Sequence, residues 1–155
     1  SSPVSKVSLE AIARFCAEAF GLPTTIARLN TIYGRFGGLP VMDMDAVVAG
    51  RVVRAVADPN VHSPLHMDDA LEQLEALLGA ASPRALVVNW AGDEVVSTQD
   101  WCAQAARLSG RPAQIEVAAI PGILAGNAVD VSRRRAITGP CRRSFAPSFA
   151  ALYRE

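Results

Sequence analysis

The order of apolar and polar residues divides the chain into segments with a helical repeat and segments with a strand-like repeat. Apolar residues recur every three to four positions in some segments, and in others they are continuous or alternate with polar residues. Continuous apolar runs of this length are typical of buried parallel strands. The pattern predicts helices over 4–20, 43–48, 71–79, 98–108, 130–136 and 144–153, and strands or extended segments over 24–29, 51–56, 61–66, 85–90 and 114–118.

Residue types that commonly begin or end helices occur at several of these predicted boundaries. Gly21 and Pro23 follow the first helix, as a C-terminal glycine and a later proline should. The segments 69–72 and 97–100 both have the spacing of a capping box, in which the first side chain accepts from a free backbone N–H group. Asp69 is therefore predicted to cap a helix. The segment 34–41, which contains three glycines, is predicted to be a loop that opens no helix of a βαβ unit.

The alternation of helices and strands with short connections predicts an α/β fold with a mainly parallel sheet. We expect the strands at 24–29 and 85–90 to lie parallel, next to the helix at 4–20. The apolar stripe of that helix should pack on the sheet. Its members are Val7, Ile12, Phe15, Cys16, Ala19 and Phe20.

Composition narrows the classes of function. Fifteen basic residues balance fifteen acidic ones, so no overall field favours nucleic acid or an acidic membrane. No apolar run approaches the roughly 20 residues of a membrane span. The cysteines, Cys16, Cys102 and Cys141, are odd in number and far apart, which fits a reduced, cytoplasmic protein better than a disulfide framework. Cys16 and Cys102 lie on apolar helix faces and should be packed rather than reactive.

Three short motifs occur in an order that resembles one enzyme family. They are S-P-V-S-K at 2–6, R-L-N-T-I-Y-G at 28–34 and H-S-P-L-H-M-D-D at 62–69. Together they resemble the second half of extended short-chain dehydrogenases/reductases, the NAD-dependent epimerase/dehydratase family. The resemblance implies part of a doubly wound, Rossmann-like sheet and a small C-terminal substrate lobe. The N-terminal nucleotide-binding half, with its glycine-rich turn, has no counterpart in the chain.

The resemblance also implies a division of the chain. Segments 1–34 and 67–92 would belong to the Rossmann-like sheet and its helices. Segments 35–66 and 93–155 would build the substrate lobe. We therefore expect residues 1–155 to be a single C-terminal fragment of a longer protein.

Lys6 matches the lysine of the family's Y-x-x-x-K motif, which binds the nicotinamide ribose and lowers the pKa of the tyrosine one turn earlier. The position of that tyrosine is occupied by Ser2. A serine hydroxyl has too high a pKa to replace the phenol as proton donor and acceptor. Lys6 and Ser2 are thus the catalytic candidates, and Ser2 is the main departure from the family pattern. The plain alternative for Lys6 is a solvated lysine in the first turn of a helix.

The resemblance places Asn30, Thr31 and Tyr33 in the loop that faces nicotinamide and substrate. In an open α/β sheet, ligands bind beyond the carboxyl ends of the strands, where this loop should lie. The alternative is that Tyr33 and Gly34 only pack and turn the chain. Arg28 should have a structural partner, because a charge at a buried strand end needs one.

His62 falls where nucleotide-sugar members of the family have the arginine that binds the substrate pyrophosphate. A histidine is a weaker phosphate ligand without a bidentate fork. Because Pro64 separates His62 from His66, we expect no metal site. Arg133 is a further candidate for substrate contact. It belongs to a basic cluster that we expect to be a solvated helix face: Arg133, Arg134, Arg135, Arg142 and Arg143.

The resemblance implies an NAD(P)-dependent oxidoreductase, epimerase or dehydratase that acts on a carbinol carbon of a small, sugar-like substrate, with NAD or NADP bound in the full-length protein. It is compatible with a homodimer. The first alternative is a non-catalytic relative that keeps the fold as a binding or interaction module, which Ser2 favours. The second is a stand-alone α/β domain with an unrelated small-ligand site.

Overall fold

The fold is known from a computed structural model, which describes residues 3–154. The helices are α1 (Pro3–Phe20), α2 (Leu39–Val48), α3 (Met67–Gly79), α4 (Thr98–Ser109), α5 (Ser132–Thr138) and α6 (Phe145–Leu152). The strands are β1 (Thr25–Leu29), β2 (Ile32–Gly34), β3 (Gly37–Gly38), β4 (Val53–Ala55), β5 (Val61–His62), β6 (Leu65–His66), β7 (Leu86–Trp90), β8 (Val96–Ser97) and β9 (Ile115–Val117).

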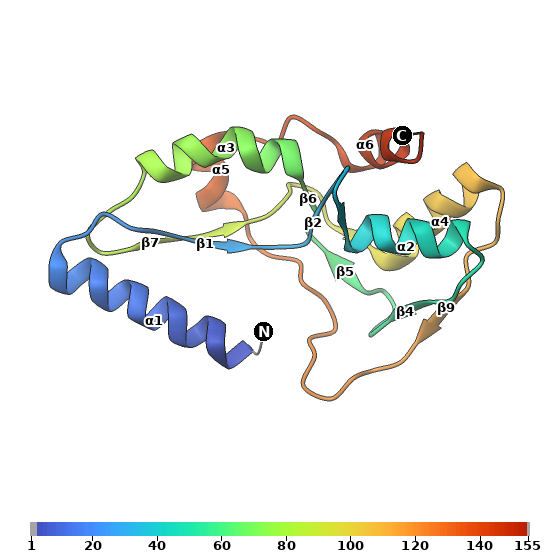
Figure 1. Ribbon diagram of the computed structural model, residues 1–155, viewed down its shortest axis with the longest axis horizontal. Helices are drawn as coiled ribbons and strands as arrows, with labels where there is room; N and C mark the ends of the chain where they lie inside the picture. The colour runs from blue at the N-terminus through green and yellow to red at the C-terminus, as the bar shows by residue number, and fades with distance from the viewer. Residues whose placement is uncertain (1–2, 155) are drawn as a thin grey trace.

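The two long strands, β1 and β7, pair in parallel, which confirms the predicted arrangement of 24–29 and 85–90. Thr25 lies opposite Leu86, and Leu29 lies opposite Trp90. Helix α3 covers one face of this pair and α1 lies against the other, so the region has three layers (Figure 1). α1 runs in the opposite direction to β1, as Figure 1 also shows. This is the expected result of a short helix-to-strand connection.

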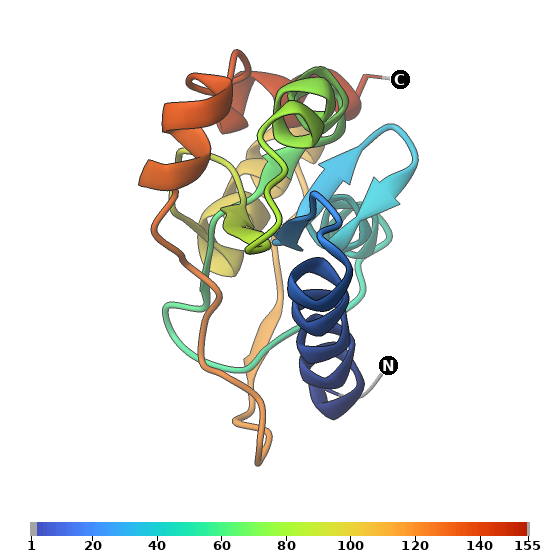
Figure 2. The same ribbon diagram turned by 90° about the vertical axis from the view of Figure 1, so that its left-hand side faces the viewer.

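Short strands and helices form a second region beyond the carboxyl ends of β1 and β7. β2 pairs with β3 and β6, β4 pairs in parallel with β9, and β5 pairs antiparallel with β8. Helices α2 and α4 lie side by side here, with α6 next to α4 (Figures 1 and 2). The buried aromatic residues of this region are Tyr33, Trp101, Phe145 and Phe149.

The apolar stripe of α1 does not pack on the sheet, so that prediction is wrong. Ile12, Phe15 and Phe20 are 60%, 65% and 66% exposed, whereas Ala17 on the inner face is fully buried. The guanidinium of Arg28 on β1 joins the two elements by donating to the Glu10 carboxylate at 2.7 and 2.9 Å. The hydrogen bonds from Arg28, together with those from Arg14, lower the Glu10 pKa to about 2. Glu10 is thus the partner expected for Arg28.

The predicted loop at 34–41 is instead a tight β2–β3 hairpin followed directly by α2. Tyr33 pairs with Gly38 across the hairpin, and Gly38 is also the N-cap of α2. A side chain on Gly38 would collide with the carbonyl oxygen of Ile32, and its φ of 107° favours glycine. The glycines thus do precede a helix. Since they belong to an antiparallel hairpin, they do not open a parallel βαβ unit.

The capping prediction is confirmed for one helix and wrong for the other. Ser97 and Asp100 form a reciprocal capping box at the start of α4. α3 begins at Met67, and its N-cap is His66, whose Nδ1 accepts from the Asp68 backbone N–H at 3.2 Å. Asp69 therefore lies inside the first turn of α3. None of the helices in the described part of the chain is long and apolar enough to cross a membrane.

Candidate functional site

Polar residues gather where β1 and β7 end, because the carboxyl ends of parallel strands meet at one side of a sheet. The Asn30 backbone N–H donates to the carbonyl of Trp90 at 2.9 Å. The carbonyl of Thr31 accepts from the backbone N–H of Leu65 at 2.8 Å. These bonds hold the segment after β1 between the main sheet and the second region.

His62 lies directly beside Thr31. Their side chains meet at 3.2 Å, between Thr31 Oγ1 and His62 Nδ1, and the imidazole packs against Trp101 with ring centroids 5.2 Å apart. Burial lowers the pKa of His62, which favours the neutral imidazole. Its Nε2 is buried without a hydrogen-bond partner in the described chain. Thr31 and His62, both predicted as substrate contacts, are thus brought together.

Asn127, a residue outside every motif of the sequence, completes this cluster. Its carbonyl accepts from the Asn30 side-chain amide at 2.8 Å, and its backbone N–H donates to the carbonyl of Val61 at 2.7 Å. It also forms an isolated parallel bridge with His62. No local pattern marks Asn127, since its partners lie 66 and 97 positions away. We call Asn30, Thr31, His62 and Asn127 the strand-end cluster.

The catalytic candidates of the sequence analysis lie on or before α1. Lys6 is exposed near the start of that helix. No contact joins it to the strand-end cluster in the part of the chain that the structure describes. Ser2 lies outside the described residues.

Tyr33 is a core residue, 1% exposed. Its ring packs against His66 and Phe145, with centroids 5.1 and 5.0 Å apart. Burial raises the pKa of its hydroxyl. This packing favours the alternative in which Tyr33 and Gly34 pack and turn the chain.

Arg133 lies on the outer edge of β7, and its guanidinium makes no hydrogen bond to the strand-end cluster within the described residues. Its Nη1 donates to the carbonyl of Val87 at 2.9 Å. The expectation of a solvated basic face is wrong for its neighbour Arg134, whose side chain is fully buried and paired with Asp93. Arg143 is partly buried as well and pairs with Asp69 at 2.8 Å.

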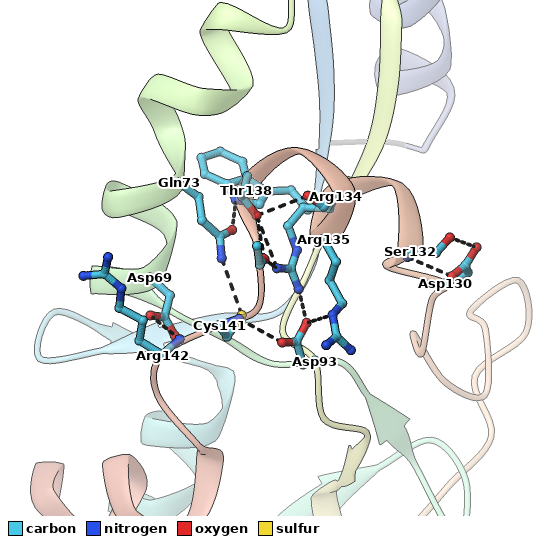
Figure 3. A network of polar contacts seen from close by, with 12 residues as sticks. Asp69, Gln73, Asp93, Asp130, Ser132, Arg134, Arg135, Thr138, Cys141 and Arg142 are labelled. Carbon is cyan, nitrogen blue, oxygen red and sulfur yellow. Dashed lines mark hydrogen bonds and ion pairs between the residues drawn. The ribbon is translucent and has the colours of Figure 1, made fainter.

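Asp69, Asp93, Cys141 and Arg143 line a cavity of about 140 Å³ between α3 and the segment that joins α5 to α6. The Asp93 carboxylate is bound by Arg134 and by the backbone N–H of Cys141 (Figure 3). The Asp69 carboxylate is bound by the Arg143 side chain and by the backbone N–H groups of Arg142 and Arg143. The Gln73 amide contacts Cys141 Sγ at 3.5 Å, and burial raises the pKa of that thiol. Because these groups are engaged with one another, the cavity is a structural junction rather than a reactive centre.

Comparison with known proteins places the fold. No protein-family model and no curated protein gives a significant match to the sequence. Solved structures do match the fold. UDP-glucuronic acid 4-epimerase from Bacillus cereus, in complex with UDP-glucuronic acid and NAD, matches with a TM-score of 0.81 at 21% identity. UDP-glucose 4-epimerase from Thermus thermophilus, in complex with NAD, matches with a TM-score of 0.82 at 17% identity. dTDP-glucose 4,6-dehydratase from Streptomyces venezuelae, with NAD bound, matches with a TM-score of 0.82 at 19% identity.

Each of these matches covers 97% of this chain but only 50%, 53% and 49% of the respective structure. The chain thus spans about half the length of the solved structures it matches. Its fold is that of about half of an extended short-chain dehydrogenase/reductase of the NAD-dependent epimerase/dehydratase type. Identities near 20% establish this likeness for the fold alone.

The residues of this chain fit only part of a dinucleotide. The strand-end cluster offers hydroxyl, amide and imidazole groups, and Lys6 offers one cation. A dinucleotide pyrophosphate is commonly held by a glycine-rich turn at the start of a helix in a βαβ unit. Within residues 3–154, the one glycine turn that opens a helix belongs to the β2–β3 hairpin. Residues 3–154 therefore show no glycine turn of the βαβ type for the pyrophosphate.

Proposed function

We propose that residues 1–155 form the C-terminal, substrate-side part of an NAD(P)-dependent oxidoreductase of the epimerase/dehydratase type. The observation that carries the proposal is the match of nearly the whole chain to half of three NAD-bound enzymes. The strand-end cluster supports it, because its polar groups lie at the carboxyl end of β1, where open α/β sheets bind ligands. The second region, from β2 to β9 and α6, would be the substrate lobe.

Each residue of the proposed site has a distinct task. NAD(P), when bound, exchanges a hydride with a carbinol carbon of the substrate. Lys6 would bind the nicotinamide ribose, and Asn30 and Thr31 would offer hydrogen bonds to the substrate hydroxyl groups. His62 would orient the Thr31 hydroxyl through the contact at 3.2 Å. Tyr33 and Arg133 are left out of this site because their side chains are engaged elsewhere.

The substrate is a small, sugar-like molecule with a secondary hydroxyl group. Matched structures contain UDP-glucuronic acid or UDP-glucose. A nucleotide sugar needs cationic groups for its pyrophosphate, and charge-assisted bonds from arginine serve this best. Because His62 is buried and tends to be neutral, it does not supply that charge. We therefore favour a hydroxylated substrate without a diphosphate group.

Calorimetry on two polypeptides tests the proposal: residues 1–155, and the native reading frame extended upstream. The extended polypeptide should bind NAD or NADP, and Lys6→Ala should weaken that binding about tenfold, equivalent to about 1.4 kcal/mol. Arg14→Ala also removes one positive charge from this helix, but at a residue outside the proposed site. It is therefore the control and should leave the affinity unchanged. Micromolar binding by residues 1–155 alone, or no binding by the extended polypeptide, would contradict the proposal.

A second candidate is a non-catalytic module that keeps the fold for binding or interaction. Ser2, at the position of the family's tyrosine, is the observation that favours it. A serine hydroxyl does not serve as the proton donor near neutral pH. Ser2→Tyr in the extended polypeptide separates the two candidates. If the fold keeps its catalytic geometry, this change raises the rate of cofactor reduction, whereas a module without a substrate site stays inactive.

A further inference from the structure

The two ring nitrogens of His62 have different surroundings. Nδ1 lies 3.2 Å from Thr31 Oγ1, whereas Nε2 is buried without a hydrogen-bond partner among the described residues. The residue is 8% exposed, and burial lowers its pKa, which favours a neutral imidazole with a single ring proton. In a neutral imidazole one nitrogen donates and the other accepts. The position of that proton therefore sets which group donates at the contact with Thr31.

The burial of Nε2 favours a proton on Nδ1. A proton on Nε2 would be a buried donor without an acceptor, and such a donor loses its hydration without compensation. In folded proteins a buried N–H without a partner is rarer than an acceptor with an unused lone pair. With the proton on Nδ1, the imidazole donates to Thr31 Oγ1. The hydroxyl of Thr31 then acts as the acceptor in this contact and keeps its own proton for another partner.

The Thr31 hydroxyl has room for that partner. Thr31 is only partly buried, and within residues 3–154 its hydroxyl has no hydrogen bond besides the contact with His62. A hydroxyl group carries one proton and two lone pairs, so it can accept from the imidazole and donate elsewhere at the same time. The group that it meets in the strand-end cluster must then be an acceptor, such as a hydroxyl or carbonyl oxygen.

The indole of Trp101, on α4, holds the imidazole of His62 in place. The two ring centroids lie 5.2 Å apart with 38° between the planes, and the indole is fully buried. An indole N–H only donates, so it needs an acceptor when it is buried. Asp43 on α2 supplies one, since its Oδ2 accepts from Trp101 Nε1 at 2.8 Å. A continuous series of contacts thus joins α2 and α4 to the strand-end cluster.

We propose that Thr31 donates its hydroxyl proton to an acceptor oxygen of the substrate, because the imidazole of His62 donates to Thr31 from Nδ1. Trp101 and Asp43 are positioning residues for this hydrogen bond, since they act through the imidazole. The task of the Thr31 proton rests on the proposed function, whereas the direction of the hydrogen bond from His62 does not depend on it.

Two-bond 1H–15N NMR of the histidine rings in residues 1–155 tests this direction. At pH 8, above the ordinary imidazole pKa of about 6.5, His62 should carry its proton on Nδ1 in an excess of at least about tenfold. His66 is the internal comparison, because its Nδ1 accepts from the Asp68 backbone N–H and its proton should lie on Nε2. His66→Gln assigns the signals. A His62 proton on Nε2 would overturn the proposal.

This measurement needs no cofactor. Its failure is therefore distinguishable from failure of the proposed function, which the calorimetry with NAD or NADP detects.

Two substitutions of Asp43 test the positioning role in the same spectra. Asp43→Asn keeps an acceptor for the indole N–H, so the His62 pattern should stay as it is. Asp43→Leu removes the acceptor and loosens the indole, so the excess of the Nδ1 form should fall at least about threefold. Asp45→Leu, at an exposed position of the same helix, is the matched control and should change nothing.

A double variant covers the case in which Asp43→Leu does not fold. Trp101→Phe combined with Asp43→Leu removes donor and acceptor together and keeps an aromatic ring, which costs less stability than removing one partner. It should show the same fall in the Nδ1 form of His62. An unchanged His62 pattern in every folded variant would show that Asp43 and Trp101 only stabilise the core, and it would overturn their positioning role.

Discussion

The guanidinium of Arg134, on α5, donates to the carboxylate of Asp93, which follows β7 (Figure 3). The Arg134 side chain is fully buried and that of Asp93 is 19% exposed. Asp93 also accepts from the backbone N–H of Cys141 at 2.8 Å, and Arg134 donates to the carbonyl of Gly139 at 2.7 Å. One ion pair thus ties α5 and the segment after it to the end of the main sheet.

Replacing Arg134 should lower the stability of the protein substantially. Arg134→Met leaves the Asp93 carboxylate without its buried partner, so the free energy of unfolding should fall by about 3–5 kcal/mol. Urea denaturation followed by circular dichroism measures this. Arg135→Met is the control, because Arg135 is 53% exposed and lies 3.9 Å from the same carboxylate. It should cost less than about 1 kcal/mol, and equal losses in the two variants would contradict the assigned role.

Asp43 on α2 should make stability depend on pH. Burial raises the pKa of its carboxyl group to about 6. The Nε1–H of Trp101, which donates to this carboxylate at 2.8 Å, acts in the opposite direction but is the smaller effect. Because the folded state favours the protonated form, Asp43 contributes stability at low pH, and that contribution is lost as the pH rises through about 6. Asp43→Asn keeps an acceptor without the charge. It should therefore raise the unfolding free energy at pH 7.5 by about 1–3 kcal/mol.

The gain from Asp43→Asn should disappear in acid, below the ordinary pKa of 3.8 for this carboxyl group. Denaturation curves across this pH range give the measurement. Asp45→Asn, on the exposed side of the same helix, should show no comparable gain. If Asp43→Asn has the same effect at every pH, the stability change has another cause.

Replacing Asp69 should lower the free energy of unfolding by more than the loss of a helix cap does. Its buried carboxylate accepts from the backbone N–H groups of Arg142 and Arg143, both at 3.2 Å, and from the Arg143 side chain. Asp69→Ala should therefore lower the unfolding free energy by about 3 kcal/mol, rather than the roughly 1 kcal/mol typical of a lost cap. Asp68→Ala, at a side chain 56% exposed, is the comparison and should cost less than about 1 kcal/mol.

We expect His62 and His66 to bind no structural metal ion. His62 Nδ1 contacts Thr31 at 3.2 Å, and His66 Nδ1 accepts from the backbone N–H of Asp68. Metal analysis of the purified protein should find no stoichiometric zinc. Zinc at one ion per chain that disappears in His62→Gln or His66→Gln would overturn this expectation.

Features set by near neighbours in the sequence were predictable. The Ser97–Asp100 capping box needs only four consecutive residues. The parallel pairing of β1 with β7 is a long-range feature, and it was predictable because both strands are continuous apolar runs in a chain that alternates helices and strands. The β2–β3 hairpin was missed because its strands have only three and two residues, which is too short for an alternating pattern to show.

The site was predictable in part. Thr31 and His62 were named through the family resemblance of the motifs at 28–34 and 62–69, and the fold brings the two side chains together. Asn127 was missed because its contacts come from a loop far along the chain. Arg134 looked like one of several solvated arginines, and only the partner, Asp93, reveals that it is buried.

The cover that Arg133 places over β7 also limits how the chain can associate with itself. Two chains that paired through their β1 edges would form one continuous sheet with β7 at both ends. At each end, Arg133 would occupy the outward-facing carbonyl of Val87. A third chain would have to displace this arginine before it could pair with β7, so growth of the sheet beyond two chains is disfavoured.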